Sequence, residues 1–348
     1  MRALTVEPGV KGSAALEDVP DTSAADGDYL VESLQVGLCG TDAEIVGGAY
    51  GEAPPGERRL VLGHEAVGRV VRAPDGAPLS SGDLVVPVVR RPDPEPCASC
   101  AQGEWDMCLN GRYTEHGITR LHGFARDSYA LDPRFAVAVP ASLGELAVLV
   151  EPASVVAKAW EQVERIASRS TRRPRTAAVV GAGPIGLLAT LMGVQRGLEV
   201  HTVDLVTDGP KPRLVSSLGA TYHHDGLATA CDAPDVIIEC TGVGAVVLDA
   251  VETVGPSGIV CLAGLSSGAR KVELSMAELN RQMVLENVVV FGTVNANLRH
   301  YRLAVEALDS AGRDWLEGLV TRRVPVERWQ DALDKRADDV KVVLDLRA

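Results

Sequence analysis

Apolar positions along the chain follow two patterns. Up to about residue 157, short apolar runs such as YLVESLQVGL and GDLVVPVVRR alternate with turns rich in Gly, Pro and Asp. This pattern is typical of short strands and predicts a small barrel-like β domain. From about Thr176, the runs TAAVVGAGPIG, LLATLMGVQRG and LEVHTVDL predict a strand, a helix and a strand in turn. Repeated alternation of this kind indicates βαβ units and a parallel sheet, so we predict an α/β fold.

The C-terminal part returns to short strands. After Asn297 come an amphipathic helix in YRLAVEALDSAG and two strand candidates, LVTRRVPV and VKVVLDL. These elements complete no domain by themselves, so we expect them to join the first domain. We therefore predict one domain from residues 1–157 and 296–348, and a parallel-sheet domain from residues 158–295. The charged segment 165–175 is interpreted as a surface crossing between the two regions.

Composition narrows the class of protein. A chain of 348 residues is longer than one core usually serves, which supports two domains. The formal net charge of -13 argues against a nucleic acid or an anionic membrane as partner, because both favour a basic surface. No apolar run is long enough for a membrane helix and no secretion signal is visible, so we expect a cytoplasmic protein. Seven cysteines, three of them clustered, indicate a metal site with buried thiols rather than a disulfide framework.

A glycine-rich motif lies between a predicted strand and a predicted helix; it consists of Gly181, Ala182, Gly183, Pro184, Ile185 and Gly186. In this context its glycines permit a tight turn, a close approach to a pyrophosphate and close helix packing. Asp204 ends the next predicted strand, where a carboxylate binds the adenosine ribose hydroxyls and favours NAD. Lys211 and Arg213 follow closely, so NADP stays open. The structural alternatives are a plain turn for the glycines and a surface helix cap for Asp204.

Cys39, His64 and Glu65 carry side chains that bind zinc, and three protein ligands would leave one position for water or substrate. Each residue also has a structural interpretation. Cys39 could be a small buried thiol, His64 and Glu65 a hydrogen-bonded pair, and Glu151 an acid at the start of a helix. Neighbouring residues on a strand point to opposite faces, so His64 and Glu65 can share a metal only if the backbone turns there.

A family resemblance bears on these alternatives. The motifs GLCGTD, GHEAVG, GDLVVP, the cysteine cluster, EPASVVAKA, GAGPIG and GTVNAN occur in this order over nearly the whole chain. Together they resemble a zinc-dependent medium-chain alcohol dehydrogenase. The segments CGTDAEIVGGAYG, VVRR, HGFARDSYALDP and GTVNAN are most similar to the glucose dehydrogenase branch. This resemblance implies a GroES-like β-barrel catalytic domain and a Rossmann dinucleotide-binding domain.

The resemblance also implies site residues. A catalytic zinc would be held by Cys39, His64 and, directly or through water, Glu65 and Glu151. Sugar hydroxyls would be bound by Glu115 and by Asn295 or Asn297; Asn297 is assigned here to the substrate and Asn295 to the cofactor. Thr41 would begin a proton relay or cap a helix, and Glu65, if it is not a ligand, is a candidate general base.

The cysteine cluster departs from the family pattern. A four-cysteine lobe binds a structural zinc in the family, and Cys97, Cys100 and Cys108 match its last three positions. Pro94 stands where the first cysteine should be. Asp93 or Glu95 could supply the fourth ligand, since three thiolates and a carboxylate suit zinc. The alternative is a metal-free loop with exposed thiols.

The resemblance implies oxidation of a sugar hydroxyl, such as that of glucose to its lactone, with zinc and NAD or NADP. Val89 stands where some family members have an asparagine, which favours as an alternative a polyol, cyclitol or other secondary alcohol from a biosynthetic pathway. A third hypothesis is a non-catalytic dinucleotide-binding redox sensor. It would fail if activity survived alkylation of the cluster thiols but not Cys39→Ala. We expect a homodimer or homotetramer, with the edge strand VVVFGTV as a candidate contact.

Overall fold

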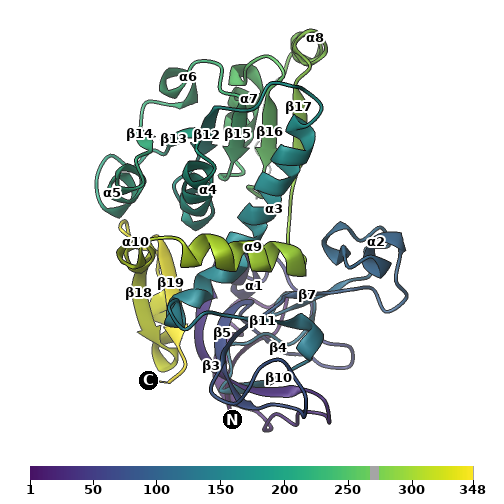
Figure 1. Ribbon diagram of the computed structural model, residues 1–348. Coiled ribbons are helices and arrows are strands. Elements are labelled where there is room, and N and C mark those ends of the chain that lie inside the picture. The colour runs from purple at the N-terminus through teal and green to yellow at the C-terminus, as the bar shows by residue number, and fades with distance from the viewer. Residues whose placement is uncertain (267–273, 348) are drawn as a thin grey trace. The chain divides into compact units, whose positions relative to one another are not determined.

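The computed structural model describes residues 1–266 and 274–347. They form two compact units (Figure 1). Unit 1 contains residues 1–154 and 295–348, and unit 2 contains residues 155–294. Within the described ranges, no helix combines the length and the apolar character that crossing a membrane requires.

Unit 1 is rich in short strands, as the apolar runs predict. They are β1 (Arg2–Val6), β2 (Ala15–Asp18), β3 (Tyr29–Leu38), β4 (Leu60–Val61), β5 (Glu65–Arg72), β6 (Leu84–Pro87), β7 (Arg90–Arg91), β8 (Thr114–His116), β9 (Arg120–Leu121), β10 (Ser128–Leu131), β11 (Ala136–Ala138), β18 (Val320–Pro325) and β19 (Lys341–Asp345). Its largest sheet has the order β11-β6-β5-β3-β19-β18, and β10 also pairs with β3. In the first half of β3, the alternating side chains place Tyr29 and Val31 in the core and Glu32 at the surface.

The C-terminal strands join this sheet. β19 pairs antiparallel with β3, with Val343 opposite Gly37, and β18 pairs parallel with β19. The predicted return of these strands to the first domain is therefore confirmed. Short helices complete unit 1: α1 (Gly40–Val46), α2 (Ala98–Ala101), η1 (Trp105–Met107), η2 (Pro133–Phe135), η3 (Gly144–Leu149), α9 (Leu298–Asp309), α10 (Arg313–Leu319), η4 (Val326–Arg328) and α11 (Trp329–Leu333).

The described residues of unit 2 form one parallel sheet of six strands. The strands are β12 (Thr176–Val180), β13 (Glu199–Val203), β14 (Thr221–His223), β15 (Val236–Glu239), β16 (Ile259–Leu262) and β17 (Val289–Gly292). The helices are α4 (Pro184–Gln195), α5 (Pro210–Ser217), α6 (Leu227–Ala230), α7 (Gly244–Thr253) and α8 (Met276–Glu286). The strand order is β14-β13-β12-β15-β16-β17, which reverses direction at β12. This is the doubly wound Rossmann order, as the alternation of elements predicts.

The apolar sequence of unit 2 explains its packing. β12 is buried from Ala177 to Val180, because a central strand of a parallel sheet is covered on both faces. Helix α4 is buried from Gly186 to Gly193. Gly193 permits close contact with the indole of Trp160, since a Cβ at this position would lie 3.0 Å from the ring.

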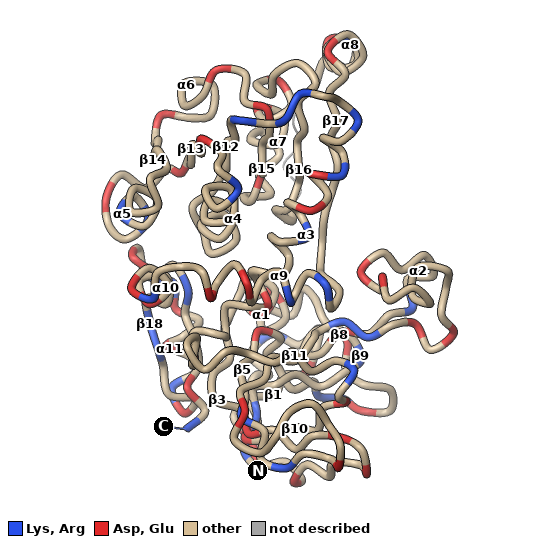
Figure 2. Tube along the Cα trace, viewed as in Figure 1, with Lys and Arg blue, Asp and Glu red and all other residues tan. Residues whose placement is uncertain are grey.

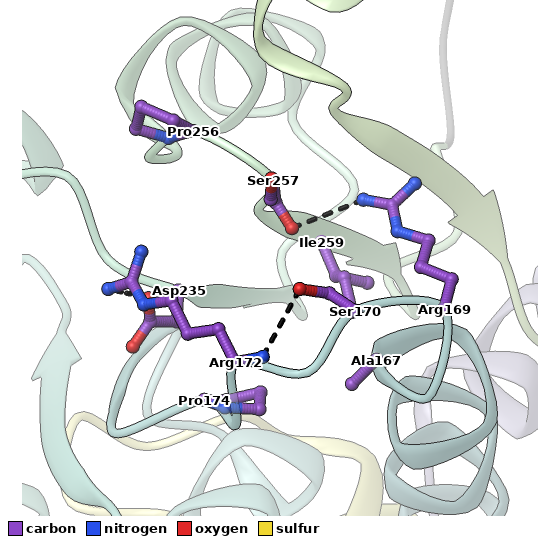
Figure 3. Close-up of a pocket in the computed structure, with 9 residues that line it drawn as sticks. All are labelled: Ala167, Arg169, Ser170, Arg172, Pro174, Asp235, Pro256, Ser257 and Ile259. Carbon is purple, nitrogen blue, oxygen red and sulfur yellow. Dashed lines mark hydrogen bonds and ion pairs between the residues drawn. The ribbon is translucent and has the colours of Figure 1, made fainter.

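The crossing between the units differs from the prediction. It falls inside helix α3 (Val150–Ala167), between Ser154 and Val155, so the interpretation of segment 165–175 as the crossing is wrong. That segment belongs to unit 2 and appears as a basic stretch before β12 in Figure 2. Two of its arginines bind within the unit, Arg172 to Asp235 at 2.6 Å and Arg169 to the carbonyl of Ser257 at 3.1 Å (Figure 3).

Candidate active site

Cys39, His64 and Glu65 lie together in unit 1. Their ligand atoms are all within 4.8 Å of one another. Cys39 precedes helix α1, and Glu65 is the first residue of strand β5. The backbone turns just before that strand, because Gly63 has φ +88 and a Cβ there would lie 2.6 Å from Val36. His64 itself lies outside the strand, so the alternation of a regular strand does not separate its ligand atom from that of Glu65.

Asp42 connects Cys39 to His64. One carboxylate oxygen accepts a hydrogen bond from the Cys39 amide at 2.9 Å, and the other lies 3.4 Å from His64 Nδ1. His64 Nε2 therefore faces Cys39 Sγ, at 3.1 Å. Burial disfavours a charged imidazole, but the charges of Asp42 and Cys39 outweigh burial and raise the pKa of His64 well above its usual value. The cluster thus attracts positive charge.

Lys341 is part of this region, although the sequence did not suggest it. Its ammonium group forms an ion pair with Glu65 and donates a hydrogen bond to the carbonyl of Leu38 at 3.0 Å. Lys341 is 1% exposed and Glu65 is 3% exposed. The only available signal was a lysine at the start of the apolar run VKVVLDL, where a buried charge needs a partner.

Glu151 and Thr41 adjoin the cluster. Glu151 lies in the first turn of α3 and is not part of the group of three ligand atoms found among the described residues. Burial, with the nearby charge of Glu65, raises the pKa of Glu151 to about 7. The amide of Thr41 donates to Cys39 Sγ at 3.2 Å. Cys39 rather than Thr41 is therefore the cap of α1.

The glycine-rich loop of unit 2 joins β12 to α4. Gly181 has φ +97, in the left-handed region that favours glycine. A Cβ on Gly186 would lie 1.7 Å from the carbonyl oxygen of Gly181, so only glycine fits where the helix passes the loop. A Cβ on Gly183 would meet nothing within 4 Å. Gly183 thus leaves free space at the start of α4, whose first amides lack a side-chain cap.

Asp204 directly follows strand β13 and contacts the glycine-rich loop. Its carboxylate accepts a hydrogen bond from the amide of Ala182 at 2.7 Å and forms an ion pair with Lys211 at 3.1 Å. Burial opposes ionisation, but the Ala182 amide and the Lys211 charge hold the pKa of Asp204 below its usual range. The residue is therefore an ionised acid fixed beside the glycine-rich loop.

Glu115, Asn295 and Arg90 form a second buried group in unit 1. Glu115 Oε1 accepts a hydrogen bond from Asn295 Nδ2 at 2.8 Å and lies 2.9 Å from Arg90 Nη2. Asn297 is linked to this group through Asp106, whose carbonyl accepts from Arg90. Asn297 Oδ1 accepts from the Arg299 amide, and its Nδ2 donates to Asp106 at 2.8 Å, so the side chain caps helix α9.

Comparison with known proteins places these features in a family. The model of the glucose dehydrogenase C-terminus matches residues 144–346, and that of the alcohol dehydrogenase GroES-like domain matches residues 25–141. A glucose 1-dehydrogenase of Thermoproteus tenax is 41% identical over 100% of both chains. One of Vulcanisaeta moutnovskia is 39% identical over 99% of both. The chain belongs to the zinc-dependent medium-chain alcohol dehydrogenases. Within them it falls in the glucose dehydrogenase branch.

A solved structure supports the same assignment. The glucose dehydrogenase of Haloferax mediterranei, in complex with NADP, Zn and gluconolactone, is 31% identical. It has a TM-score of 0.91 over 99% of both chains. The predicted combination of a GroES-like β-barrel domain and a Rossmann domain is confirmed. The roles of individual residues remain predictions.

The cluster in unit 1 fits the zinc of this dehydrogenase family. It offers a thiol, an imidazole and a carboxylate, a donor set that suits catalytic zinc. Asp42 faces His64 Nδ1, which leaves Nε2 for a metal, and a carboxylate in this place is the usual support of a zinc-binding histidine. The ion pair with Lys341 holds Glu65 in its present orientation. Glu65 would have to leave Lys341 in order to bind a metal directly.

The cysteine lobe of this family member has three clustered sulfurs. Those of Cys97, Cys100 and Cys108 lie within 4.8 Å of one another. The amides of Cys100 and Leu109 donate to Cys97 Sγ and lower the pKa of that thiol to about 6. The two acids proposed as fourth ligand are engaged elsewhere. Asp93 binds Asn110 at 2.7 Å, and Glu95 binds Arg112 at 2.9 Å.

Proposed function

We propose that this protein is a zinc-dependent, NAD(P)-linked dehydrogenase that oxidises a sugar hydroxyl, such as that of glucose to its lactone. The observation that carries the proposal is the Cys39, His64 and Glu65 cluster in a chain of the glucose dehydrogenase branch. The similar protein of Haloferax mediterranei was solved with NADP, Zn and gluconolactone. We assign catalysis to the GroES-like domain, residues 1–157 and 296–348, and dinucleotide binding to residues 158–295.

In this proposal, Cys39, His64 and an acid hold the metal. When bound, zinc supplies a Lewis acid that makes a hydroxyl oxygen easier to deprotonate at neutral pH. Asp42 orients His64 through Nδ1, and the buried Lys341 balances the charge of Glu65. The acid is Glu65 or Glu151, either directly or through water. The Thr41 hydroxyl would receive the substrate proton first.

The loop of Gly181, Gly183, Pro184, Ile185 and Gly186 would bind the dinucleotide pyrophosphate. Support comes from the space beside Gly183 and from the uncapped amides of helix α4. Asp204 would accept hydrogen bonds from the adenosine ribose, which favours NAD. Lys211 already offsets part of the charge of Asp204, so the site would also accept the 2'-phosphate of NADP.

Val89 supports a second class of substrate, the polyols, cyclitols and other secondary alcohols. Val89 is 1% exposed, and its amide donates to the Tyr301 hydroxyl at 3.2 Å. A valine there offers no side-chain hydrogen bond to a substrate hydroxyl. Polyols, cyclitols and other secondary alcohols, whose hydroxyls are placed differently, therefore remain the alternative substrates.

Reduction of NAD and NADP by the purified protein tests the proposal against a panel of aldoses, polyols and cyclitols. We expect turnover of at least one aldose, loss of turnover with a zinc chelator, and product identified as the lactone. Turnover restricted to polyols or cyclitols would support the alternative substrate class. Turnover of none of these compounds, although dinucleotide binds, would refute sugar oxidation.

We further propose that Cys97, Cys100 and Cys108 bind a structural zinc, for which Asp93 or Glu95 would supply the fourth ligand by leaving its present partner. Support comes from the clustered sulfurs of the three cysteines. Metal analysis of the purified protein should give two zinc ions per chain, and one in the variant Cys100→Ser. One zinc ion in both proteins would contradict this assignment.

The expected partner besides the substrate is a second copy of the chain. Strand β17 ends the sheet of unit 2, and the adjacent helix α8 exposes Val284 by 66% and Leu285 by 65%. Pairing of β17 with its counterpart would cover this edge. Ultracentrifugation should show a homodimer or homotetramer, and Leu285→Glu should shift it toward the monomer. A monomeric wild-type protein would contradict the pairing.

The expectation of a cytoplasmic location also remains a proposal. None of the seven cysteines, all of which lie in the described ranges, forms a disulfide. Free cysteines in this number are typical of a reducing compartment. Detection of the native protein in a secreted or periplasmic fraction would contradict it.

A further inference from the structure

Tyr301 is a buried tyrosine to which the proposed reaction gives no role. Helix α9 begins after its cap residue, Asn297, and buries Tyr301, Ala304 and Leu308 on one face. Tyr301 is 1% exposed. A buried hydroxyl is costly unless it forms hydrogen bonds, so the partners of this hydroxyl show which parts of the fold it connects.

The first partner of the Tyr301 hydroxyl is the backbone of Val89. This residue lies between strands β6 and β7 and is 1% exposed. The carbonyl of Val89 accepts from the amide of His116 at 3.1 Å, whereas its amide donates to the Tyr301 hydroxyl at 3.2 Å. A buried amide without an acceptor would cost free energy. A side chain from α9 thus satisfies a backbone group where the two strands are interrupted.

The second partner is Ser154, on helix α3. The Tyr301 hydroxyl forms a side-chain hydrogen bond with it. Ser154 is 0% exposed, and its hydroxyl donates to the carbonyl of Glu151 at 2.6 Å. A serine hydroxyl has only one proton, so Ser154 accepts from Tyr301 when it donates to Glu151. The hydrogen bonds therefore run in one direction, from the Val89 amide through Tyr301 and Ser154 to the Glu151 carbonyl.

This chain of hydrogen bonds does not carry a proton. It starts at an amide and ends at a carbonyl, and neither group takes up or releases a proton at neutral pH. Burial, with the nearby charge of Glu151, raises the pKa of Tyr301 well above its usual value, so the phenol stays protonated. The chain is instead suited to hold its members in place. It fixes the first turn of α3, which contains Glu151.

The Glu151 carboxyl group lies close to the metal cluster of unit 1. It is 8% exposed, and the charges of His64, Glu65 and Lys341 all act on it. A carboxylate on a flexible side chain reaches a metal consistently only if neighbouring groups fix the segment that carries it. The position of the first turn of α3 thus decides how well Glu151 can reach the metal.

We propose that Tyr301 is a positioning residue for the catalytic zinc: through Ser154 it holds the first turn of α3, so that the Glu151 carboxylate reaches the metal directly or through water. The inference rests on the proposed function and adds a residue outside the set of ligands. Without the phenol hydroxyl, α3 would keep its helical turn but lose its link to α9. Glu151 would then reach the metal less often, and zinc would be released faster.

The rate of zinc release to a coloured chelator tests the inference. The relevant phase is the one that Cys39→Ala lacks, so that zinc bound at the cysteine lobe is not counted. We expect Tyr301→Phe to release this zinc at least about tenfold faster, and Ser154→Ala to show a similar increase. The kcat for the best substrate should fall, while the KM for the dinucleotide should stay the same.

A double-mutant cycle with Glu151→Gln distinguishes positioning from a general structural role. Glu151→Gln alone should speed up zinc release. Adding Tyr301→Phe should then change the rate by less than about twofold, because Tyr301 acts through Glu151. A general loosening of the fold would instead multiply the two effects. Rates that multiply in the double variant, or an unchanged rate in either single variant, would overturn the inference.

Tyr129→Phe is the matched control. Tyr129 lies on strand β10 of the same unit and is 0% exposed, and its hydroxyl has no hydrogen-bond partner among the described residues. Its removal should leave zinc release unchanged. If the wild type shows no zinc that depends on Cys39, or oxidises no sugar or polyol, the proposed function fails and this inference fails with it. If the wild type is active and only the cycle fails, the proposed function stands.

Discussion

Around Cys39 and His64, individual residues are held by buried charges that offset one another. Glu65 and Lys341 are almost inaccessible to water and form an ion pair. Removing one partner of a buried ion pair costs far more than the pair contributes, because the other charge is left buried alone. The ion pair therefore stabilises the arrangement of the metal cluster only as long as both residues are present.

Lys341→Met should lower the free energy of unfolding by about 3 kcal/mol, because the Glu65 carboxylate loses its counter-charge. The double variant with Glu65→Gln should recover part of this loss, since no isolated charge remains. Denaturant unfolding of the chelator-treated proteins measures both. Equal stability of wild type and Lys341→Met would show that the ion pair does not form in solution.

Asp204→Asn should lower the preference for NAD over NADP. Asparagine keeps an oxygen that accepts from the Ala182 amide, but it removes the charge that repels a 2'-phosphate and frees Lys211. The ratio of kcat/KM for NAD to that for NADP should fall about tenfold, which is about 1.4 kcal/mol. Asp225→Asn, which changes an exposed acid of the same unit, should leave the ratio unchanged. An unchanged ratio in Asp204→Asn would remove this residue from the ribose site.

At the scale of elements, the end of strand β8 contains a half-buried histidine. His116 donates through Nδ1 to the carbonyl of His122 at 2.6 Å and packs on Phe124, with 4.7 Å between ring centres. Burial, with the charge of Arg91, lowers the pKa of His116 well below its usual value. The folded protein thus keeps this side chain neutral, while the unfolded chain takes up a proton below about pH 6.5.

His116 should therefore make the protein less stable as the pH falls below about 6.5. The unfolded state binds more protons in this range, so the free energy of unfolding decreases, by up to about 2 kcal/mol at pH 5. His116→Asn keeps a donor near the His122 carbonyl but does not titrate. Unfolding curves at pH 7.5 and pH 5 should show a smaller difference for His116→Asn than for the wild type. The same difference in both would contradict this role.

In the turn from β12 to α4, alanine substitutions at two glycines should affect different properties, dinucleotide binding in one case and thermal stability in the other. Gly183→Ala adds a methyl group in free space, so the protein should keep its Tm but bind the dinucleotide at least about tenfold more weakly. Gly186→Ala places a methyl group against the carbonyl of Gly181, so the Tm itself should fall. Gly312→Ala in unit 1, which also meets free space, should change neither. Normal dinucleotide affinity in Gly183→Ala would contradict pyrophosphate binding at this loop.

For the whole molecule, the sequence predicted the elements that local patterns encode, but it did not predict the contacts between residues that are distant in the chain. The alternation of strands and helices from Thr176 predicted the parallel sheet, because each element is encoded by neighbouring residues. The crossing between the units was placed wrongly because α3 continues through it without a break in its sequence. The partners Lys341 and Glu65, like the partners Glu115 and Asn295, are distant in sequence. No local pattern could have paired them.

The cysteine lobe shows the same limit. The spacing of the three cysteines predicted that their sulfurs would cluster, and the structure places them together. The spacing could not show that Asp93 and Glu95 bind Asn110 and Arg112 instead, because those contacts depend on the folded loop. Residue type and spacing thus indicate candidate ligands, while their availability follows from the fold.

The most direct test of the account is the rate of sugar-dependent NAD(P) reduction before and after zinc is removed and restored, in the wild type and in Cys39→Ala. We predict that the wild type loses its activity on zinc removal and regains it when zinc is added back. Cys39→Ala should bind the dinucleotide but stay inactive at every zinc concentration. Activity that persists in Cys39→Ala, or in wild-type protein without zinc, would contradict a catalytic zinc at Cys39 and His64.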